Sequence, residues 1–429
     1  MAQAGTLISN ADVWPRSDGK GLTLALLMTF VVGGALPIFS YLYRPSTWGI
    51  WGLTLLLIIL FSRELPLRHL MQPAVPYLLW LICFVSWGLI VAPVADLQNG
   101  VKTVITTIIV ILAMAIITSH SQYLKYFANA LQWAMFFNLM LIPLASISSK
   151  ANNIIATITL NAGAFESGVS RFSGFWGNPN MAGYVCLVAI ILSTWSTPWV
   201  AWIGRLSAVS MIYLTASRKS MLLLLLIIAL NVIIVQRHNL KSLFFMLVLA
   251  VSGLSLFVLS TGLLQKTQSR MASNRTLTRL LDVTESETAQ AGGETRLKLL
   301  QHWLPIVSSA PWYGYGSGAM AGSADETGKI VRKRLFPTGT HNTYLGILVE
   351  VGPVGLITFL LVLLYYAKNY LTYRGSIRVR WSLLSFLACN IIILIVSHSH
   401  LFSFEGKTAF ALFFLLPTSP ALWKQAFGS

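Results

Sequence analysis

The chain has 429 residues, of which 55% are hydrophobic and only 10% are charged, and its mean hydropathy is +0.71. A soluble globular domain carries about 25% charged residues, so this composition excludes a soluble globule and indicates a polytopic membrane protein. The formal net charge of +17 is compatible with nucleic acid, anionic lipid headgroups or a phosphorylated substrate as partner. Nucleic acid is the poorest fit to a chain embedded in a membrane.

The apolar stretches predict the fold class. A membrane-spanning helix needs about 20 mainly apolar residues, and the alternating pattern of barrel strands is absent, so the sequence predicts an all-α polytopic membrane protein with about 12 transmembrane helices. We expect one integrated membrane domain, with helices 1–9 in residues 1–260, a large polar loop containing short helices in 261–340, and helices 10–12 in 341–429. The predicted spans are centred near residues 30, 54, 83, 110, 137, 189, 208, 228, 250, 358, 390 and 415.

Basic residues predict the orientation of these spans. Arg16 and Lys20 precede the first apolar run and no cleavage site follows it, so we expect a retained first helix and a cytoplasmic N-terminus. Lys and Arg in short loops favour the cytoplasm, and alternating sides from this start puts the C-terminus inside as well. The opposite, periplasmic face then carries the segment 149–180, the turn at Arg218, the loop 261–340 and the connection 398–407.

Two of these periplasmic segments contain polar residues at predicted helix starts. The first ends in Asn178-Pro179-Asn180, in which either asparagine can cap the next helix or contact a ligand. In the second, Arg218 and Lys219 lie in a tight turn between two spans, where they either reach lipid headgroups or bind an anionic substrate.

The long loop carries ten Lys or Arg against six Asp or Glu. Loops of more than about 60 residues cross the membrane largely regardless of charge, so this excess does not decide the orientation. Apolar residues at Leu297, Leu300 and Leu304 predict a short amphipathic helix on the membrane surface. The glycines of 314–318 weakly resemble a phosphate-binding loop, but no strand–loop–helix unit supports that function.

His341 lies between the polar loop and an apolar helix. An imidazole there can exchange protons near neutral pH, or it can serve as a capping or interfacial residue. Arg171, Arg218 and Arg296 can present planar, permanently charged donors to phosphate oxygens. The chain has only 13 Asp plus Glu and no Asp-x-Asp sequence, so we expect no metal site.

The three cysteines lie in apolar spans without Cys-x-x-Cys spacing, which predicts neither a disulfide framework nor a zinc site. We expect Cys83, Cys186 and Cys389 to be small core residues.

In this order, these features make the chain resemble the O-antigen ligases and the related polysaccharide polymerases and protein O-oligosaccharyltransferases. The resemblance covers most of the chain and rests on the layout of spans, the late periplasmic loop, and the residues Arg171 to Asn180, Arg218, Arg296, Pro311, Gly314 to Gly318, His341, Asn342, Leu345 and Gly352.

The resemblance implies a GT-C-like helical enzyme in the inner membrane of a Gram-negative bacterium. Such an enzyme moves a glycan from undecaprenyl diphosphate to a sugar hydroxyl of lipid A-core on the periplasmic side, which completes lipopolysaccharide, and it needs no cofactor, metal or nucleotide. His341 would match the family's essential histidine, and Arg218 and Arg296 its essential arginines on the diphosphate. Direct displacement would then invert the anomeric configuration. Further site candidates from the same face are Arg171, Asn178, Asn180, His302, Asn342, His398, His400 and Glu405.

Other activities remain open at this stage. A polymerase would use a second lipid-linked glycan as acceptor, and a protein O-oligosaccharyltransferase would use a protein hydroxyl. A transporter for a lipid-linked sugar would bury charges or broken helices near the midplane of the membrane. The spans are almost uncharged, with Glu350 as an exception, which favours interfacial catalysis.

Overall fold

A computed structural model describes residues 18–33, 44–91, 97–146, 173–176, 178–215, 217–235, 296–316, 342–396 and 404–419. Within these ranges the chain is helical and contains no strand, which confirms the all-α prediction. The longer helices are α2 (Asp18–Val32), α4 (Arg44–Ser62), α6 (Val75–Val91), α7 (Leu97–Ser119), α8 (Ser121–Ser146), α10 (Pro179–Leu192), α11 (Pro198–Leu214), α12 (Arg218–Val235), α15 (Arg296–Ser309), α16 (Thr343–Leu371), α17 (Ile377–Val396) and α18 (Phe404–Leu415). The short ones are α5 (Leu67–Met71), η2 (Gln72–Ala74), η3 (Gly174–Trp176), η4 (Ser193–Trp195) and η5 (Leu416–Thr418).

Every predicted span except the one centred near residue 250 coincides with one of these helices, and residue 250 lies outside the described residues. In the described part, five helices are long and apolar enough to cross a membrane: Leu67–Gly88, Val101–Ser119, Ser121–Leu144, Thr343–Leu371 and Ile377–Ile395. Several apolar helices of 10–17 residues accompany them. The chain is therefore a multi-pass membrane protein, while the total of about 12 spans and the GT-C class stay predictions.

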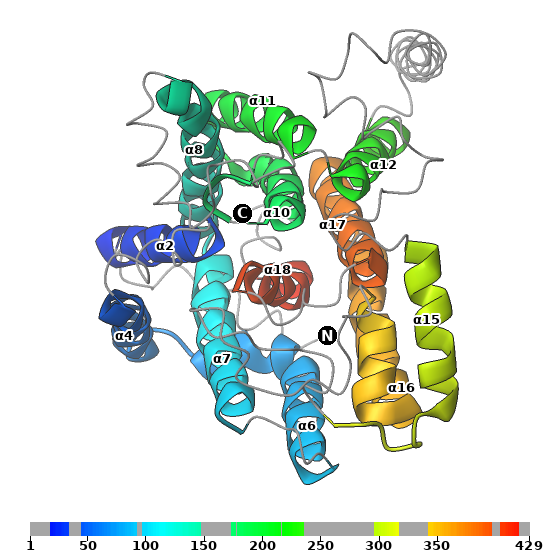
Figure 1. Cartoon of the computed structure of the whole chain (residues 1–429). Coiled ribbons are helices and arrows are strands. Elements are labelled where there is room, and N and C mark those ends of the chain that lie inside the picture. Colours follow the sequence, from blue (N-terminus) through cyan, green and yellow to red (C-terminus); the bar gives the residue numbers. More distant parts are fainter. Residues whose placement is uncertain are drawn as a thin grey trace, which may run out of the picture.

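Helix α18 lies at the centre of the bundle (Figure 1). It contacts α7, α2, α17 and α10, and every side chain from Gly406 to Pro417 is buried. With 12 residues it is only about 18 Å long, shorter than the hydrocarbon core of a bilayer at about 30 Å. The last predicted span is thus a short, enclosed helix whose two ends do not both reach the membrane surfaces.

Close helix packing depends on a few small residues, as is usual between helices in membranes. Helices α8 and α11 pack extensively at Gly204, where an added Cβ would lie 2.5 Å from Cβ and 2.7 Å from Cδ of Gln132. The buried Gln132 side chain in turn donates from Nε2 to the Ala189 carbonyl of α10 at 2.8 Å. One glycine therefore allows three helices to meet.

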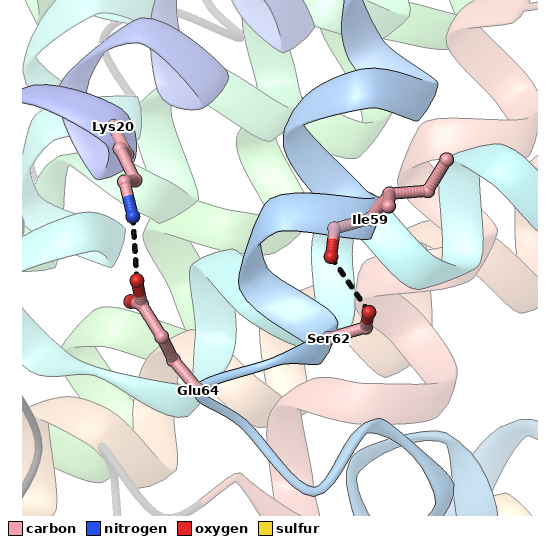
Figure 2. A network of polar contacts seen from close by, with 4 residues as sticks. All are labelled: Lys20, Ile59, Ser62 and Glu64. Carbon is pink, nitrogen blue, oxygen red and sulfur yellow. Dashed lines mark hydrogen bonds and ion pairs between the residues drawn. The ribbon is translucent and has the colours of Figure 1, made fainter.

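An ion pair joins the start of α2 to the turn after α4. Figure 2 shows Lys20 Nζ donating to Glu64 Oε1 at 2.5 Å, beside the end of α4 where Ser62 Oγ donates to the Ile59 carbonyl at 2.6 Å. Both charged side chains are partly exposed, so the pair contributes at most about 1 kcal/mol. It does, however, place the start of α2 and the end of α4 at one end of the bundle.

The cysteine prediction is correct in two cases and wrong in one. Cys186 and Cys389 are buried, but Cys83 lies on the exposed side of α6. An outward-facing cysteine is compatible with a lipid-facing helix surface, which is apolar like the core.

Gly204→Ala should lower the stability of the fold by about 1–3 kcal/mol, because the added methyl group overlaps the buried Gln132 side chain. The measurement is the unfolding temperature of the purified protein in detergent. Gly52→Ala is the matched control: Gly52 lies on the exposed side of α4 with nothing within 4 Å of an added Cβ. An unfolding temperature for Gly204→Ala equal to that of the control would contradict the packing described.

Candidate functional site

The start of α10 is held by its asparagines. Asn178 is the N-cap: its Oδ1 accepts from the backbone N–H of Asn180 at 2.9 Å and of Met181 at 3.4 Å, and Pro179 occupies the first helical position. The predicted capping role of Asn178 is confirmed. Capping side chains of this kind contribute about 1 kcal/mol to a helix start.

The approach to α10 is anchored on two other helices. The Phe175 backbone N–H in η3 donates to Asn138 Oδ1, in the second half of α8, at 2.9 Å. Trp176 Nε1 donates to the Val32 carbonyl at 2.7 Å, at the end of α2. The start of α10 therefore lies at the end of the bundle opposite the Lys20–Glu64 pair.

The start of α12 lies beside the start of α10. Ser217 Oγ donates to Asn180 Oδ1 at 3.2 Å, and Ser220 Oγ donates to Ser217 Oγ at 3.0 Å. Helices α10 and α12 approach closely here because Gly183 faces Ser220: a Cβ added to Gly183 would lie 2.8 Å from Ser220 Cβ. Arg218, the first residue of α12, follows Ser217 directly, so its backbone is fixed beside the Asn-Pro-Asn segment.

Helix α17 connects these starts to the start of α16. Tyr184 of α10 donates from its hydroxyl to Asn390 Oδ1 at 2.8 Å, and Tyr344 of α16 donates to the carbonyl of the next residue, Ile391, at 3.4 Å. Tyr344 is only one residue into α16, whose N-cap is Asn342, with Oδ1 accepting from the Leu345 N–H at 3.1 Å. The starts of α10, α12 and α16 therefore lie at one end of the bundle.

Helix α16 is broken inside the bundle. Gly352 has φ 72° and ψ −177°, and Pro353 follows it. In an α-helix the carbonyl of residue i accepts from the N–H of residue i+4, but Pro353 has no N–H for the Val349 carbonyl, and the turn at Gly352 interrupts the ladder for Glu350. An unsatisfied carbonyl in a membrane costs several kcal/mol.

The loop segment after α15 supplies the missing donors. Tyr315 N–H donates to the Val349 carbonyl and Gly316 N–H to the Glu350 carbonyl, each at 2.8 Å. We call this pairing of residues 312–316 with residues 349–352 the backbone clamp. Gly314 and Gly316 have φ of 79° and 95°, and a Cβ on Gly314 would lie 2.5 Å from the carbonyl carbon of Glu350. Gly314 thus allows close backbone approach, and Gly316 donates to Glu350, so these two glycines serve the clamp.

Helices α15 and α6 both contact the backbone clamp. Figure 1 shows α15 alongside α16, where Trp303, 0% exposed, packs on Val349. From α6, Trp87 Nε1 donates to the Tyr313 carbonyl at 3.1 Å and Trp80 Nε1 to the Gly355 carbonyl at 3.2 Å. A helix in this part of the loop was predicted, and α15 confirms it.

The residue that α15 buries against the protein is Trp303, whereas Leu304 is 54% exposed. An exposed Leu304 is compatible with the predicted contact of this helix with the membrane surface, which stays a prediction. The spacing of the leucines could not reveal that α15 packs against α16 through a tryptophan.

The structure also shows a buried cation that the sequence analysis did not select. Lys407, in the first turn of α18, is 4% exposed, and its Nζ donates to Thr106 Oγ1 of α7 at 2.7 Å. Among the charged side chains that the structure describes, those of Lys407 and Glu350 are buried. An ionisable residue inside a span is expensive and indicates a functional site, which is the signal that could have found Lys407.

The remaining predicted site residues divide into two groups. Arg218 and Arg296 begin α12 and α15, and His302 and Glu405 lie within α15 and α18, but their side chains lie outside the described residues. Arg171, His341, His398 and His400 lie outside them altogether. Their roles therefore stay predictions, although the cap at Asn342, directly after His341, fixes the start of α16.

No group of three or more His, Cys, Asp or Glu that could hold a metal ion occurs within the described ranges. The expectation of metal-independent chemistry stays a prediction.

Comparison with known proteins gives one family. Residues 203–360 match the family model described as O-antigen ligase, and no curated protein matches the chain. The match confirms the resemblance to the O-antigen ligase family. It runs from α11 to the middle of α16, so it contains the start of α12, helix α15, both segments of the backbone clamp and Asn342.

Gly352→Ala should open the backbone clamp, because alanine is disfavoured at φ 72° and its Cβ would overlap the Trp312 carbonyl. We expect faster hydrogen exchange at the Tyr315 and Gly316 amides, measured by mass spectrometry on the purified protein. Gly52→Ala, on the exposed side of α4, is the control and should leave this exchange unchanged. Equal protection in both variants would contradict the clamp.

Proposed function

We propose that this chain, a multi-pass membrane protein matching the O-antigen ligase family over residues 203–360, is a glycosyltransferase for lipopolysaccharide. It transfers O-antigen polysaccharide from undecaprenyl diphosphate to a sugar hydroxyl of lipid A-core at the periplasmic face of the inner membrane. The family match supports action on lipid-linked polysaccharide in general. The observation that carries the proposal is that the starts of α10, α12 and α16, which bear or adjoin Asn180, Arg218 and His341, gather at one end of the bundle.

In the proposed reaction, the acceptor hydroxyl oxygen attacks the anomeric carbon of the donor sugar. A new glycosidic bond forms while the bond from that carbon to the diphosphate oxygen breaks. The hydroxyl proton passes to His341, and the bond's electron pair leaves with the diphosphate. Attack from the face opposite the leaving group inverts the anomeric configuration.

Arg218 and Arg296 stabilise the charge that develops on the leaving diphosphate. Guanidinium groups present fixed, bidentate donors to phosphate oxygens, which suits a reaction without a metal ion. The hydrogen bond between Ser217 and Asn180 holds the backbone next to Arg218, and the backbone clamp holds the helix that Arg296 begins against the helix that follows His341. Arg171, His302, His398, His400 and Glu405 are further candidates for contacts with the two glycans.

The asparagines take supporting roles in this proposal. The side-chain oxygens of Asn178 and Asn342 cap α10 and α16, and Asn180 accepts a hydrogen bond from Ser217. Each of them fixes the backbone beside a proposed reactive residue.

A transporter for the lipid-linked glycan is the second candidate. The break in α16 at Gly352, the short helix α18 and the buried residues Glu350 and Lys407 are features that transporters use near the membrane midplane. The family match favours the transferase.

The purified protein in liposomes, given undecaprenyl-diphosphate glycan and lipid A-core with chelator and without nucleotide, should produce glycosylated lipid A-core. Mass spectrometry of the extracted lipids measures the product, and His341→Ala should reduce it to background because the base is lost. Elongated lipid-linked glycan in place of this product would indicate a polymerase. Neither product, with glycan moved across the liposome membrane, would indicate the transporter.

Arg218→Lys should lower the transfer rate by about tenfold or more, because lysine keeps the charge but loses the planar fork. Initial rates at saturating acceptor measure the effect. Arg374→Lys is the matched control, since Arg374 is an exposed residue in the turn between α16 and α17. A wild-type rate in Arg218→Lys would make Arg218 a lipid headgroup contact.

A further inference from the structure

The end of the bundle opposite the proposed transfer site carries two neighbouring arginines, Arg205 of α11 and Arg378 of α17. Helix α10 starts at the transfer end, so the turn η4, which follows its last residue, lies toward the other end. Helix α17 begins at that other end too, because α16 starts at the transfer end and finishes just before it. The predicted orientation makes this the cytoplasmic end.

A hydrogen bond ties Arg205 to η4. Its Nε donates to Ser193 Oγ at 2.6 Å, and that hydroxyl in turn donates to the Ile190 carbonyl at 2.6 Å. Side chains of a helix lean toward its amino end, so the partly buried Arg205 side chain reaches back along α11 to this turn. The bond uses one of the five N–H donors of the guanidinium, and the Nη groups have no partner among the residues that the structure describes.

Arg378 approaches the same turn from α17. Ser382 lies on the same face of α17 as Arg378, since residues four apart are neighbours on a helix. The hydroxyl groups of Ser382 and Thr194, the latter in η4, share a hydrogen bond of 2.6 Å. That face of α17 therefore meets η4, and the positive charges of Arg205 and Arg378 lie close enough to repel each other.

Tryptophans indicate where the membrane surface lies. Trp199 and Trp202, early in α11, are 58% and 64% exposed. Exposed tryptophans concentrate at the boundary between the hydrocarbon core and the headgroups of a bilayer. Arg205 follows Trp202 by about one turn, and its side chain leans back toward this boundary. The arginine pair is thus near the level of the lipid phosphates.

The acidic side chains that the structure describes do not neutralise this pair. Glu64 pairs with Lys20, and Glu350 lies next to the break in α16. An arginine that only extended toward water could turn away from a second positive charge, but the bond to Ser193 holds Arg205 in place. Two like charges held together are destabilising, and an anion that accepts from both guanidinium groups would offset the repulsion.

We propose that Arg205 and Arg378, on either side of the turn η4, bind the phosphate of an anionic phospholipid headgroup from the cytoplasmic leaflet. Guanidinium groups present paired N–H donors to phosphate oxygens, and basic places between helices on the cytoplasmic side suit anionic headgroups. A headgroup needs no enclosed cavity, because the lipid reaches the pair from the bilayer itself. The bound phosphate links α11 to α17 at the end of the bundle away from the transfer site, so this inference does not depend on the proposed function.

The test is the affinity of the full-length purified protein, in detergent, for short-chain phosphatidylglycerol, measured by native mass spectrometry. Arg205→Gln keeps a hydrogen-bond donor and removes the charge, and Arg378→Gln removes the charge on α17. We expect each variant to bind at least about tenfold more weakly than wild type, the size expected for losing one charge-assisted hydrogen bond. Wild-type affinity in both variants would overturn the site.

Arg68→Gln is the matched control, because Arg68 is an exposed arginine of α5 at the same predicted face of the membrane. It should bind phosphatidylglycerol as wild type does. A loss equal to that of Arg205→Gln and Arg378→Gln would replace the site by a general attraction of lipid to a positive surface.

Parallel titrations of the wild-type protein identify the ligand. Phosphatidylethanolamine of the same chain length carries a phosphate but no net charge, and glycerol phosphate carries the charge but no acyl chains. We expect phosphatidylglycerol to bind most tightly of the three. Equal affinity for phosphatidylethanolamine would overturn the preference for an anionic headgroup, and equal affinity for glycerol phosphate would overturn a membrane lipid as the ligand.

The partly buried position of Arg205 makes a second variant necessary. Should Arg205→Gln not fold, Arg378→Gln decides alone, because it replaces an exposed side chain. Weaker binding of phosphatidylglycerol in Arg378→Gln then supports the site, and unchanged binding overturns it.

Discussion

The structure around the proposed site depends on one constraint: a backbone carbonyl inside a membrane must find a donor. Pro353 removes the donor for Val349, and Gly352 turns the chain away from the helical ladder, so α16 has two carbonyls to satisfy part-way along its length. The N–H groups of Tyr315 and Gly316 satisfy them. A stretch of the long polar loop is thereby fixed against the one helix whose start follows His341.

This constraint explains why glycines occupy the positions at which the loop and α16 pair. Gly314, Gly316 and Gly352 all have positive φ, and Gly314 and Gly352 meet the partner backbone so closely that a Cβ would overlap it. A glycine-rich stretch in a basic loop suggests phosphate binding when the sequence is considered alone. Here the described glycines serve backbone-to-backbone contact, and the proposed function assigns phosphate binding to arginines instead.

Much of the fold could be predicted from the sequence, because helix positions in a membrane follow from apolar length and local stop signals. Asn178-Pro179 marks the start of α10 by local chemistry alone, and the turn before Arg218 is likewise local. The buried face of α15 could not be predicted. Trp303 is enclosed because it packs on Val349, which belongs to a distant segment of the chain, while Leu304 remains exposed. The depth of Lys407 was missed for the same reason: it depends on how short α18 is and on Thr106, 301 residues earlier.

The two buried charged residues differ in what surrounds them, and this difference bears on the choice between transferase and transporter. Glu350 lies next to the break of α16, where its own carbonyl and that of Val349 accept from the loop segment of the backbone clamp. Hydrogen bonds from a separate segment therefore hold the broken part of α16 in place. Lys407, in α18, donates instead to Thr106 of α7. A break held in place next to the helix start that follows His341 supports the proposed transferase over the transporter.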